Sequence, residues 1–503
     1  MTTPTPTLLL PSLPPKILIG IDLLSFTSTP HFAGIKNLPP GPHFLYTGTT
    51  ESFSLRSGEW IFVRDDTALT SRRSIGDSST ATPEIHIRKW DAETEALVPL
   101  DEGTEAGRRE GMMYRANLGR IWASGGLLGY ERAREEAGEA RRRDDNGGTG
   151  GAQLVASNHH HDTDTDTDDW PLLTNYISPA VLERILPSST TSTSPRCWTI
   201  SSGSTAARDR DDIPGLSAAD VARATASSAA GEQEKELRFL PIDLKRTWRA
   251  GAVGRERTEA AKDRSWALGD IIGGFGSTDA GTATTTATDN DDKEAGEKQI
   301  LGELQFTFLM VLTLMNFSCL EQWKRLLGLL LTCRAAVVAR EGFFVSVIRL
   351  LRVQLRHFED VEGGLFEMDG DEGGALLRKL LGGFVGIVTE IEGDADADAV
   401  EGNNEGLLRD VKRELGLLEE WVQREYGWEL RRGMTVRRGM VDLEDGERVE
   451  LEVAGAEEED ESGDYAPVVV DLGEGEFGGD AEGDIEGEGE GEVVSDVDMS
   501  EMR

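Results

Sequence analysis

The sequence predicts an α+β multidomain protein, with a β-rich, sandwich-like or barrel-like N-terminal domain followed by an all-α helical C-terminal domain. Three observations predict it: short apolar stretches between turn residues begin the chain, helical periodicity fills its second half, and an acidic, glycine-rich stretch ends it. We expect the β-rich domain at 1–186 with a disordered insertion at about 131–169, a linker at 187–235, the helical domain at 236–430 and an acidic disordered tail at 431–503.

The N-terminal domain begins with short strand candidates separated by turns. In the last of them, Ile85 and Ile87 alternate with polar residues, as in a strand with one buried face. Pro39-Pro40-Gly41 predicts a sharp turn, because proline fixes φ and glycine accepts positive φ. Strands at this spacing, without helices between them, indicate an antiparallel sandwich or open barrel. The candidates are Thr7–Leu10, Ile17–Asp22, His43–Thr47, Trp60–Arg64 and Glu84–Trp90.

Two short helices are expected to close this domain, at 117–130 and 170–186. Between them lie arginine-rich, glycine-rich and repeated Asp-Thr segments, and the stretch that follows is rich in Ser, Thr and Ala. Neither stretch can bury enough apolar surface to offset the entropy lost on ordering. They are therefore interpreted as an insertion and a linker.

Amphipathic helices are expected from residue 236 onward. In the clearest of them, Leu304, Phe308 and Met315 recur on one helical face. At least five such segments with short joints indicate an all-α layer or a solenoid-like domain. The uncharged stretch 304–320 contains several polar residues and is therefore expected to be a buried core helix rather than a membrane span.

The charge balance constrains the partners. With 92 acidic against 52 basic residues, the formal net charge is −40. Non-specific nucleic-acid binding draws on a surplus of positive charge, so direct RNA binding is not expected and a protein partner with basic grooves is favoured. The three cysteines, Cys197, Cys319 and Cys333, form neither a disulfide framework nor a zinc motif, which fits a reducing compartment.

Candidate catalytic and metal-binding groups are sparse. His159-His160-His161 precede a run of aspartates, but no regular structure is expected around them to set a coordination geometry. The glycine-rich stretch Gly269–Gly276 lacks the lysine and the preceding strand of a phosphate loop. His43 fits a turn or core position better than a catalytic base. The sequence thus predicts no enzyme, no cofactor and no metal, with a metal-assisted hydrolase as one remaining alternative.

One apolar segment interrupts the acidic tail. Three β-prone valines, Val468, Val469 and Val470, follow Tyr465 and Pro467 and have no neighbouring strand in the sequence. Such a segment can add to an exposed sheet edge of a partner, where backbone hydrogen bonds supply affinity. In that arrangement the tyrosine acts as an aromatic anchor. The alternatives are pairing with the chain's own β domain, or no regular structure.

Two further sets of residues are considered as contact surfaces. Trp323 falls on an apolar face and is expected in the core, whereas Lys324 and Arg325 point elsewhere and are predicted partner-binding residues. Three arginines flank the apolar face of another helix. They are interpreted either as a stripe exposed to solvent or as a docking or RNA-facing patch. They are Arg349, Arg352 and Arg356.

Several phrases, in this order, resemble the A1 cistron-splicing factor family. The most specific is LGELQF, and the order and spacing of all of them across nearly the whole chain make coincidence improbable. The low-complexity insertions and the end of the tail fall outside the resemblance. The phrases are GID at 20–22, FAGIK at 32–36, PPGPHF at 39–44, LTNYIS at 173–178, ELRF at 236–239, LGELQF at 301–306, WKRLL at 323–327 and YAPVVV at 465–470.

The resemblance implies a non-enzymatic assembly factor for the U5 small nuclear ribonucleoprotein in pre-mRNA splicing, found in cytoplasm and nucleus. It implies binding to the large U5 scaffold protein, through that partner's RNase H-like, endonuclease-like and Jab1/MPN-like domains. This occupancy would keep the U5 helicase off the scaffold until maturation, with the tail strand bridging domains of the partner. The alternative is a generic helical scaffold protein with an RNA-facing basic patch.

Overall fold

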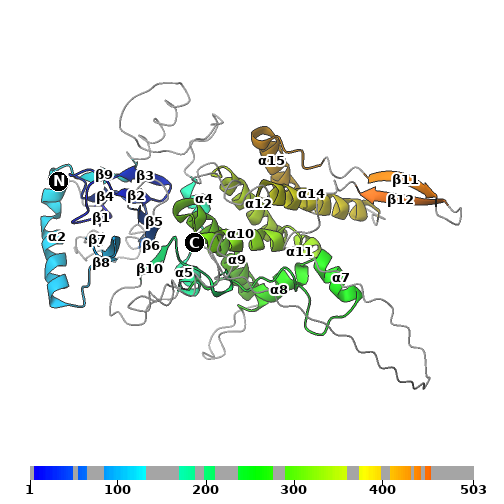
Figure 1. The fold of residues 1–503 in the computed structure, drawn as a ribbon, viewed down its shortest axis with the longest axis horizontal. Coiled ribbons are helices and arrows are strands. Elements are labelled where there is room, and N and C mark those ends of the chain that lie inside the picture. The colour runs from blue at the N-terminus through cyan, green and yellow to red at the C-terminus, as the bar shows by residue number, and fades with distance from the viewer. Residues whose placement is uncertain are drawn as a thin grey trace, which may run out of the picture. The chain divides into compact units, whose positions relative to one another are not determined.

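The computed structural model describes residues 5–48, 55–64, 84–131, 169–186, 197–209, 236–275, 289–358, 373–397 and 408–431, and the backbone of 436–442 and 448–454. A β-rich N-terminal part precedes a helical C-terminal part, as the sequence predicts (Figure 1). The predicted domain boundaries themselves stay a prediction.

Two five-stranded sheets form the N-terminal part. The first has the order β8-β7-β1-β4-β9 and the second β10-β6-β5-β2-β3. All five predicted strands are present. Most pairs are antiparallel, as expected, but β1 pairs with β7 and β4 with β9 in parallel, between segments far apart in sequence. The strands are β1 (Thr7–Leu9), β2 (Leu18–Ile21), β3 (Leu24–Thr27), β4 (Gly34–Lys36), β5 (Gly41–Gly48), β6 (Arg56–Val63), β7 (Ile85–Asp91), β8 (Ala96–Pro99), β9 (Leu127–Gly129) and β10 (Trp198–Ser201).

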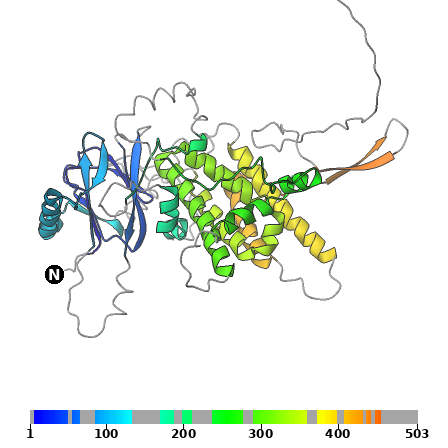
Figure 2. The same ribbon diagram turned by 90° about the horizontal axis from the view of Figure 1, so that it is seen from below.

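Alternating side chains place each sheet between two apolar layers. Leu8 and Leu45 belong to the core shared by the two sheets, whereas Leu9, next along β1, packs in a separate cluster with helix α2 (Glu105–Ala123). Phe44 of β5 points to the opposite side of its sheet and joins the large core of the helical part. This follows from the two-residue period of a strand. Helix α2 lies beside the first sheet in both views (Figures 1 and 2).

The helix predicted at 117–130 is displaced toward the N-terminus. Helix α2 begins after Thr104, whose hydroxyl accepts a hydrogen bond from the Gly107 amide at 3.1 Å. It ends before Gly125, whose φ of 76° turns the chain, and Leu127–Gly129 then forms β9. Glycine adopts this left-handed conformation without steric cost, so the turn ends the helix.

Part of the predicted linker 187–235 is regular structure. Trp198–Ser201 forms β10, which pairs antiparallel with β6, and Ala207–Asp209 forms a 3₁₀ turn. Trp198 and Ile200 are buried. The sequence pattern did not predict this strand, because its apolar residues are few and lie among serines and threonines. Its pairing strand, β6, also lies far away in sequence.

The helical part is built around α9 and α10, which are buried along most of their described length. The short helix predicted at 170–186 is present as two helices, α4 and α5, and the predicted consecutive helices follow (Figure 2). The helices are α4 (Trp170–Thr174), α5 (Pro179–Ile185), α7 (Arg255–Lys262), α8 (Ser265–Gly273), α9 (Asp289–Leu314), α10 (Phe317–Leu330), α11 (Arg334–Ala339), α12 (Glu341–Leu355), α14 (Gly373–Ala397) and α15 (Arg409–Tyr426).

The uncharged stretch 304–320 is buried, as predicted, but it is not one helix. Met315 has a φ of 53°, and Asn316 caps the start of α10 by accepting a hydrogen bond from the Cys319 amide at 2.9 Å. The chain therefore turns between α9 and α10. Among the residues that the structure describes, no helix has the length and apolar character needed to cross a membrane.

The predicted disordered tail begins with a hairpin. Val436–Asp442 (β11) and Arg448–Ala454 (β12) pair antiparallel, with Val436 opposite Ala454 and Asp442 opposite Arg448. Almost all of 431–503 was expected to be disordered, and these two strands are an exception within the described residues. In β12, Val449, Leu451 and Val453 alternate with charged residues, which is a local signal for β structure.

Candidate protein-interaction site

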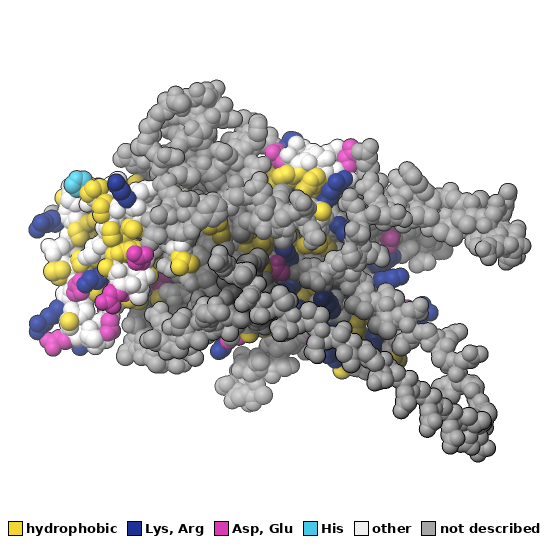
Figure 3. Space-filling view, viewed as in Figure 1, with side chains coloured by type: hydrophobic (Ala, Val, Ile, Leu, Met, Phe, Trp, Pro, Cys, Tyr) yellow, Lys and Arg dark blue, Asp and Glu magenta, His cyan; other side chains and the backbone are white. Residues whose placement is uncertain are grey.

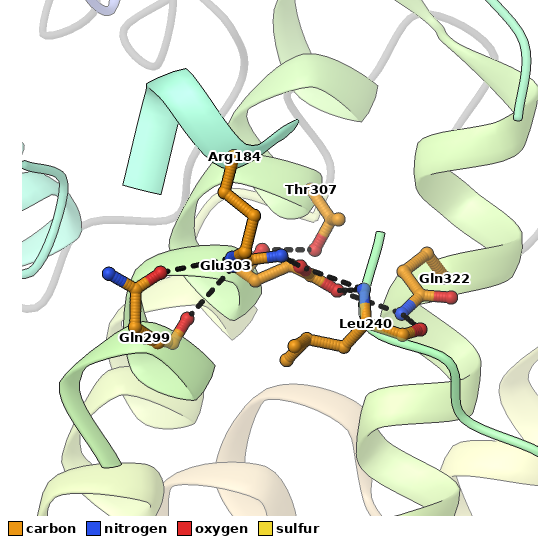
Figure 4. Close-up of polar contacts among 6 residues, drawn as sticks. All are labelled: Arg184, Leu240, Gln299, Glu303, Thr307 and Gln322. Carbon is orange, nitrogen blue, oxygen red and sulfur yellow. Dashed lines mark hydrogen bonds and ion pairs between the residues drawn. The ribbon is translucent and has the colours of Figure 1, made fainter. Parts of the chain in front are cut away.

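A buried carboxylate joins four segments of the helical part. Glu303 of α9 is fully buried. Its oxygens accept hydrogen bonds from the Leu240 amide at 3.0 and 3.2 Å and from Gln322 Nε2 of α10 at 2.8 Å, and they pair with Arg184 of α5 at 2.5 Å (Figure 4). A buried charge is tolerated when it is paired and hydrogen-bonded in this way. Glu303 therefore fastens α5, α9, α10 and the segment 236–250 together.

The next buried polar residue of LGELQF contacts a second phrase. Gln305 Nε2 donates to the Leu172 carbonyl at 2.9 Å and to Asn175 Oδ1 at 2.6 Å, and its Oε1 accepts from the Tyr176 amide at 2.8 Å. At Gly302, a Cβ atom would lie 2.6 Å from the Tyr176 carbonyl oxygen. Only glycine allows this approach. LGELQF and LTNYIS thus pack directly against each other.

The second sheet is joined to the helices by both polar and apolar contacts. Arg56 of β6 donates to the Thr313 carbonyl of α9 at 3.0 Å, and the rings of Trp60 and Phe306 lie 6.3 Å apart. Asn316 Nδ2 donates to three carbonyls of residues 201–204, the shortest of these bonds measuring 2.8 Å. The outer face of this sheet is therefore part of the helical core rather than a free surface.

The GID and PPGPHF phrases form a buried network inside the β part. Asp22 is 1% exposed and accepts hydrogen bonds from His43 Nδ1 at 2.7 Å, Tyr130 Oη at 2.6 Å and the Phe44 amide at 2.9 Å. His43 Nε2 lies 2.8 Å from the Pro39 carbonyl oxygen. Because both ring nitrogens face oxygen atoms of the chain, His43 has no nitrogen available to a substrate. It is a core histidine, as the sequence indicates.

The quoted phrases within the described residues thus contribute many interior contacts that hold the fold together. The sequence pattern identified the phrase LGELQF. It did not identify Arg184 and Gln322 as the residues that bind Glu303. These partners come from other segments, and no short-range pattern connects them to the glutamate. Residues that bind a partner must be sought outside these interior contacts.

The two helical residues predicted to bind a partner differ in their surroundings. Trp323 is buried, as expected, and donates through Nε1 to Gln354 at 3.1 Å. Arg325 is 6% exposed and pairs with Asp209 at 2.6 Å, so its charge is used inside the chain. Lys324 is half-buried and lies 3.0 Å from Glu321. Lys324 stays a predicted contact residue, while Arg325 is better described as an internal ion-pair partner.

The arginine stripe of α12 is paired with acidic residues. Arg349 and Arg352 lie 2.8 and 3.7 Å from the Glu414 carboxylate of α15. The hydrogen bond from Arg349 holds the pKa of Glu414 below its ordinary value. Arg356 lies 3.4 Å from Asp169. These contacts favour a structural role for the stripe over RNA docking.

Asp169 is held by Arg356 and His357, which directly follow helix α12. Burial alone would raise its pKa, but a hydrogen bond from His357 and the charge of Arg356 outweigh that effect and keep the pKa of Asp169 lowered. The oxygen-to-nitrogen distance to His357 is 3.3 Å. This pair attaches the start of α4 to the end of α12.

The glycine-rich stretch, the histidine run and the tail motif are the remaining candidates from the sequence. Residues 269–273 of the glycine-rich stretch belong to helix α8 and do not form a phosphate-binding loop. His159-His160-His161 and the tail motif containing Tyr465, Pro467, Val468, Val469 and Val470 lie outside the described residues. Within the described ranges, no group of three or more His, Cys, Asp or Glu side chains could hold a metal ion.

The fold and its contacts define a class of protein: an α+β chain whose β sandwich and helical part share one core. Two family models match it, one for the AAR2 N-terminal domain over residues 4–187 and one for the AAR2 C-terminal repeat region over residues 239–431. The chain belongs to the AAR2 family, the A1 cistron-splicing factors, which confirms the resemblance seen in the sequence. It is therefore a splicing-related protein.

Curated relatives support the same assignment over most of the chain. The AAR2 homolog of Macaca fascicularis is 24% identical over 357 residues, which cover 69% of this chain and 75% of the relative. The Mus musculus homolog is 24% identical over 364 residues with the same coverage. The Homo sapiens homolog is 23% identical over 362 residues, again with 69% and 75% covered.

Proposed function

We propose that this chain is a non-enzymatic assembly factor for the U5 small nuclear ribonucleoprotein. In this role it binds the large U5 scaffold protein and sterically excludes the U5 helicase until maturation. The observation that carries the proposal is family membership over both the β-rich and the helical parts. The proposed locations are the cytoplasm and the nucleus.

The interior contacts support a binding role for the chain. Buried residues such as Glu303 and Asn316 hold the second sheet and the helices in one arrangement. A preorganised surface loses less conformational entropy when it binds. The described β part and helical part can therefore present their outer faces to a large partner together.

The tail motif is the proposed principal contact with the scaffold. Val468 and Val470 would face one side of an added strand and Val469 the other, with Tyr465 as anchor and Pro467 limiting the unbound conformations. Backbone pairing with an exposed sheet edge needs no charged groups on the tail. It therefore suits a segment placed in an acidic region.

A tail deletion tests this proposal. Affinity capture with the full chain should retain the U5 scaffold and lack the helicase, and deletion of 465–472 should weaken scaffold retention severalfold without changing thermal unfolding. Deletion of 482–489, of equal length in the same acidic tail, is the matched control and should bind like the full chain. Equal scaffold retention by all three proteins would refute the tail contact.

The alternative of an RNA-facing scaffold makes a different prediction. RNA binding through phosphates falls steeply as salt rises, whereas strand addition depends mainly on backbone hydrogen bonds. The arginines considered for RNA contact are paired with Glu414 and Asp169. On the face shown in Figure 3, acidic and basic side chains are interspersed over the described residues around α2 and the first sheet. Both observations favour a protein partner.

A further inference from the structure

A basic segment stands out in this acidic chain. Residues 245–262 carry six basic and two acidic side chains, within a protein of net charge −40. They comprise residues 245–254, which precede α7, and the whole of α7. We call this region the basic lobe.

Two contacts hold the basic lobe together. The Thr247 hydroxyl donates to the Ala260 carbonyl of α7 at 2.7 Å, and the guanidinium of Arg257 lies 5.6 Å from the centre of the Trp248 ring. Helix α7 has no buried residue among its eight. The basic side chains before and within α7 are therefore brought into one region, on a helix that contributes little to the core.

Three cations of the basic lobe have no polar side-chain partner among the described residues. Arg246, Arg249 and Lys262 are exposed, and their side chains form no hydrogen bond or ion pair with any part of the chain that the structure describes. This distinguishes them from Arg349 and Arg352 of α12, which share Glu414. Uncompensated positive charge at three neighbouring positions requires either solvent or an anionic partner.

We infer that the basic lobe is a docking surface for an acidic segment of another protein. Charge complementarity identifies the partner's chemistry, because guanidinium groups bind carboxylates through paired hydrogen bonds. Val253, which is 68% exposed between the two halves of the lobe, adds an apolar contact for a side-chain stem. A long nucleic acid is disfavoured relative to a short acidic segment, because the repulsion from a chain of net charge −40 grows with the negative charge of the ligand. This surface is separate from the tail contact proposed above.

Peptide binding to the full chain tests the inference. A labelled oligoglutamate peptide, followed by fluorescence anisotropy, should bind the wild-type protein, and the variant R246E/R249E/K262E should bind it at least about tenfold more weakly. The affinity should fall with added salt, because exposed charges are screened. The variant R120E/R378E/K379E is the matched control, since it makes the same change in net charge at exposed positions of α2 and α14. It should bind like the wild type.

Two results would overturn the inference. One is equal peptide binding by all three proteins, or no binding by any. The other is tighter binding of a labelled oligouridylate than of the peptide, lost in R246E/R249E/K262E, which would make RNA the ligand of the lobe. Circular dichroism during heating checks that each variant is folded. The alanine variant R246A/R249A/K262A provides the same comparison if charge reversal unfolds the chain.

Discussion

At the scale of single residues, the buried carboxylate of Glu303 shows how much the interior depends on partners from distant segments. Its oxygens are bonded by Leu240, Gln322 and Arg184. Removing the carboxylate leaves a guanidinium, a backbone amide and a side-chain amide without this acceptor inside the protein. The cost of leaving a group unpaired exceeds the net contribution of the contact itself.

Glu303→Ala is therefore expected to lower the free energy of unfolding by about 3 kcal/mol. Glu303→Gln keeps the shape and one acceptor oxygen, so its effect should be smaller. Urea denaturation at neutral pH measures both. Glu105→Ala, at an exposed position on α2, is the control and should change stability by less than about 0.5 kcal/mol. A loss for Glu303→Ala no larger than that of the control would contradict the role assigned to Glu303.

The cysteines offer a second residue-scale prediction. Burial raises the pKa of the Cys319 and Cys333 thiols well above the ordinary value, and the thiolate is the reactive form. Cys197 is only half-buried. A thiol reagent at pH 8 should therefore modify Cys197 first, and Cys319 and Cys333 only after denaturant is added. Mass spectrometry of the labelled peptides gives the order, and early labelling of Cys319 in the native protein would contradict the prediction.

Residue identity predicts some of these environments but not their partners. The sequence indicates that Trp323 is a core residue, because it lies on an apolar helical face, and the structure agrees. It assigns Arg325 to a contact surface, since an arginine on a helix is usually solvated. The buried acceptor for Arg325 is Asp209, which comes from the Ser- and Thr-rich stretch expected to be a linker. A pair of this kind is formed by the tertiary fold and leaves no local pattern.

At the scale of elements, α12 and α15 are coupled through a carboxylate that titrates below its ordinary range. The hydrogen bond from Arg349 lowers the pKa of Glu414 from its ordinary value of 4.5. A carboxyl with a lower pKa in the folded state stabilises that state above its unfolded pKa. The contribution disappears as the pH falls through the folded pKa.

Glu414→Gln should therefore destabilise the protein at pH 7 and have little effect at strongly acidic pH. We expect a loss of about 0.5 to 1 kcal/mol at pH 7, limited because Arg349 is half-exposed and screened by solvent. Urea denaturation of variant and wild type at a series of pH values measures the difference. A difference that stayed constant from pH 7 to strongly acidic pH, well below 4.5, would show that the ion pair is not its cause.

Elements with a clear period could be predicted, and short ones could not. Glu84–Trp90 alternates and forms β7, and the apolar faces of the helical part are found as α9, α10 and α12. Strands of three or four residues such as β4 and β10 carry too few positions for a period to show. The break at Met315 also escaped prediction, because apolar residues continue on both sides of it and the turn depends on backbone angles.

At the scale of the whole molecule, the β part and the helical part share one hydrophobic core. Trp60 of β6 packs against Trp170 of α4, with ring centres 6.1 Å apart, and against Phe306 of α9. Contacts of this size are expected to couple the unfolding of the two parts. The coupling bears directly on the domain division predicted from the sequence.

Trp60→Ala should therefore reduce protection in both parts. The loss of a buried tryptophan costs about 3 to 5 kcal/mol, and hydrogen exchange should quicken in α9 as well as in β5 and β6. Exchange detected by mass spectrometry locates the change. If α9 kept its wild-type protection while β5 and β6 lost theirs, the two parts would be independent folding units.

The placement of the family phrases in the interior affects how relatives are grouped. Gly302 and the polar residues beside it determine that α9 packs against residues 172–176. A chain that keeps these residues can form the same packing. The basic lobe and the outer face of α2 are not constrained in this way. Two proteins could share these interior phrases and still recognise different molecules, so the interior phrases report a common architecture and the partner is decided by the outer surface and the tail.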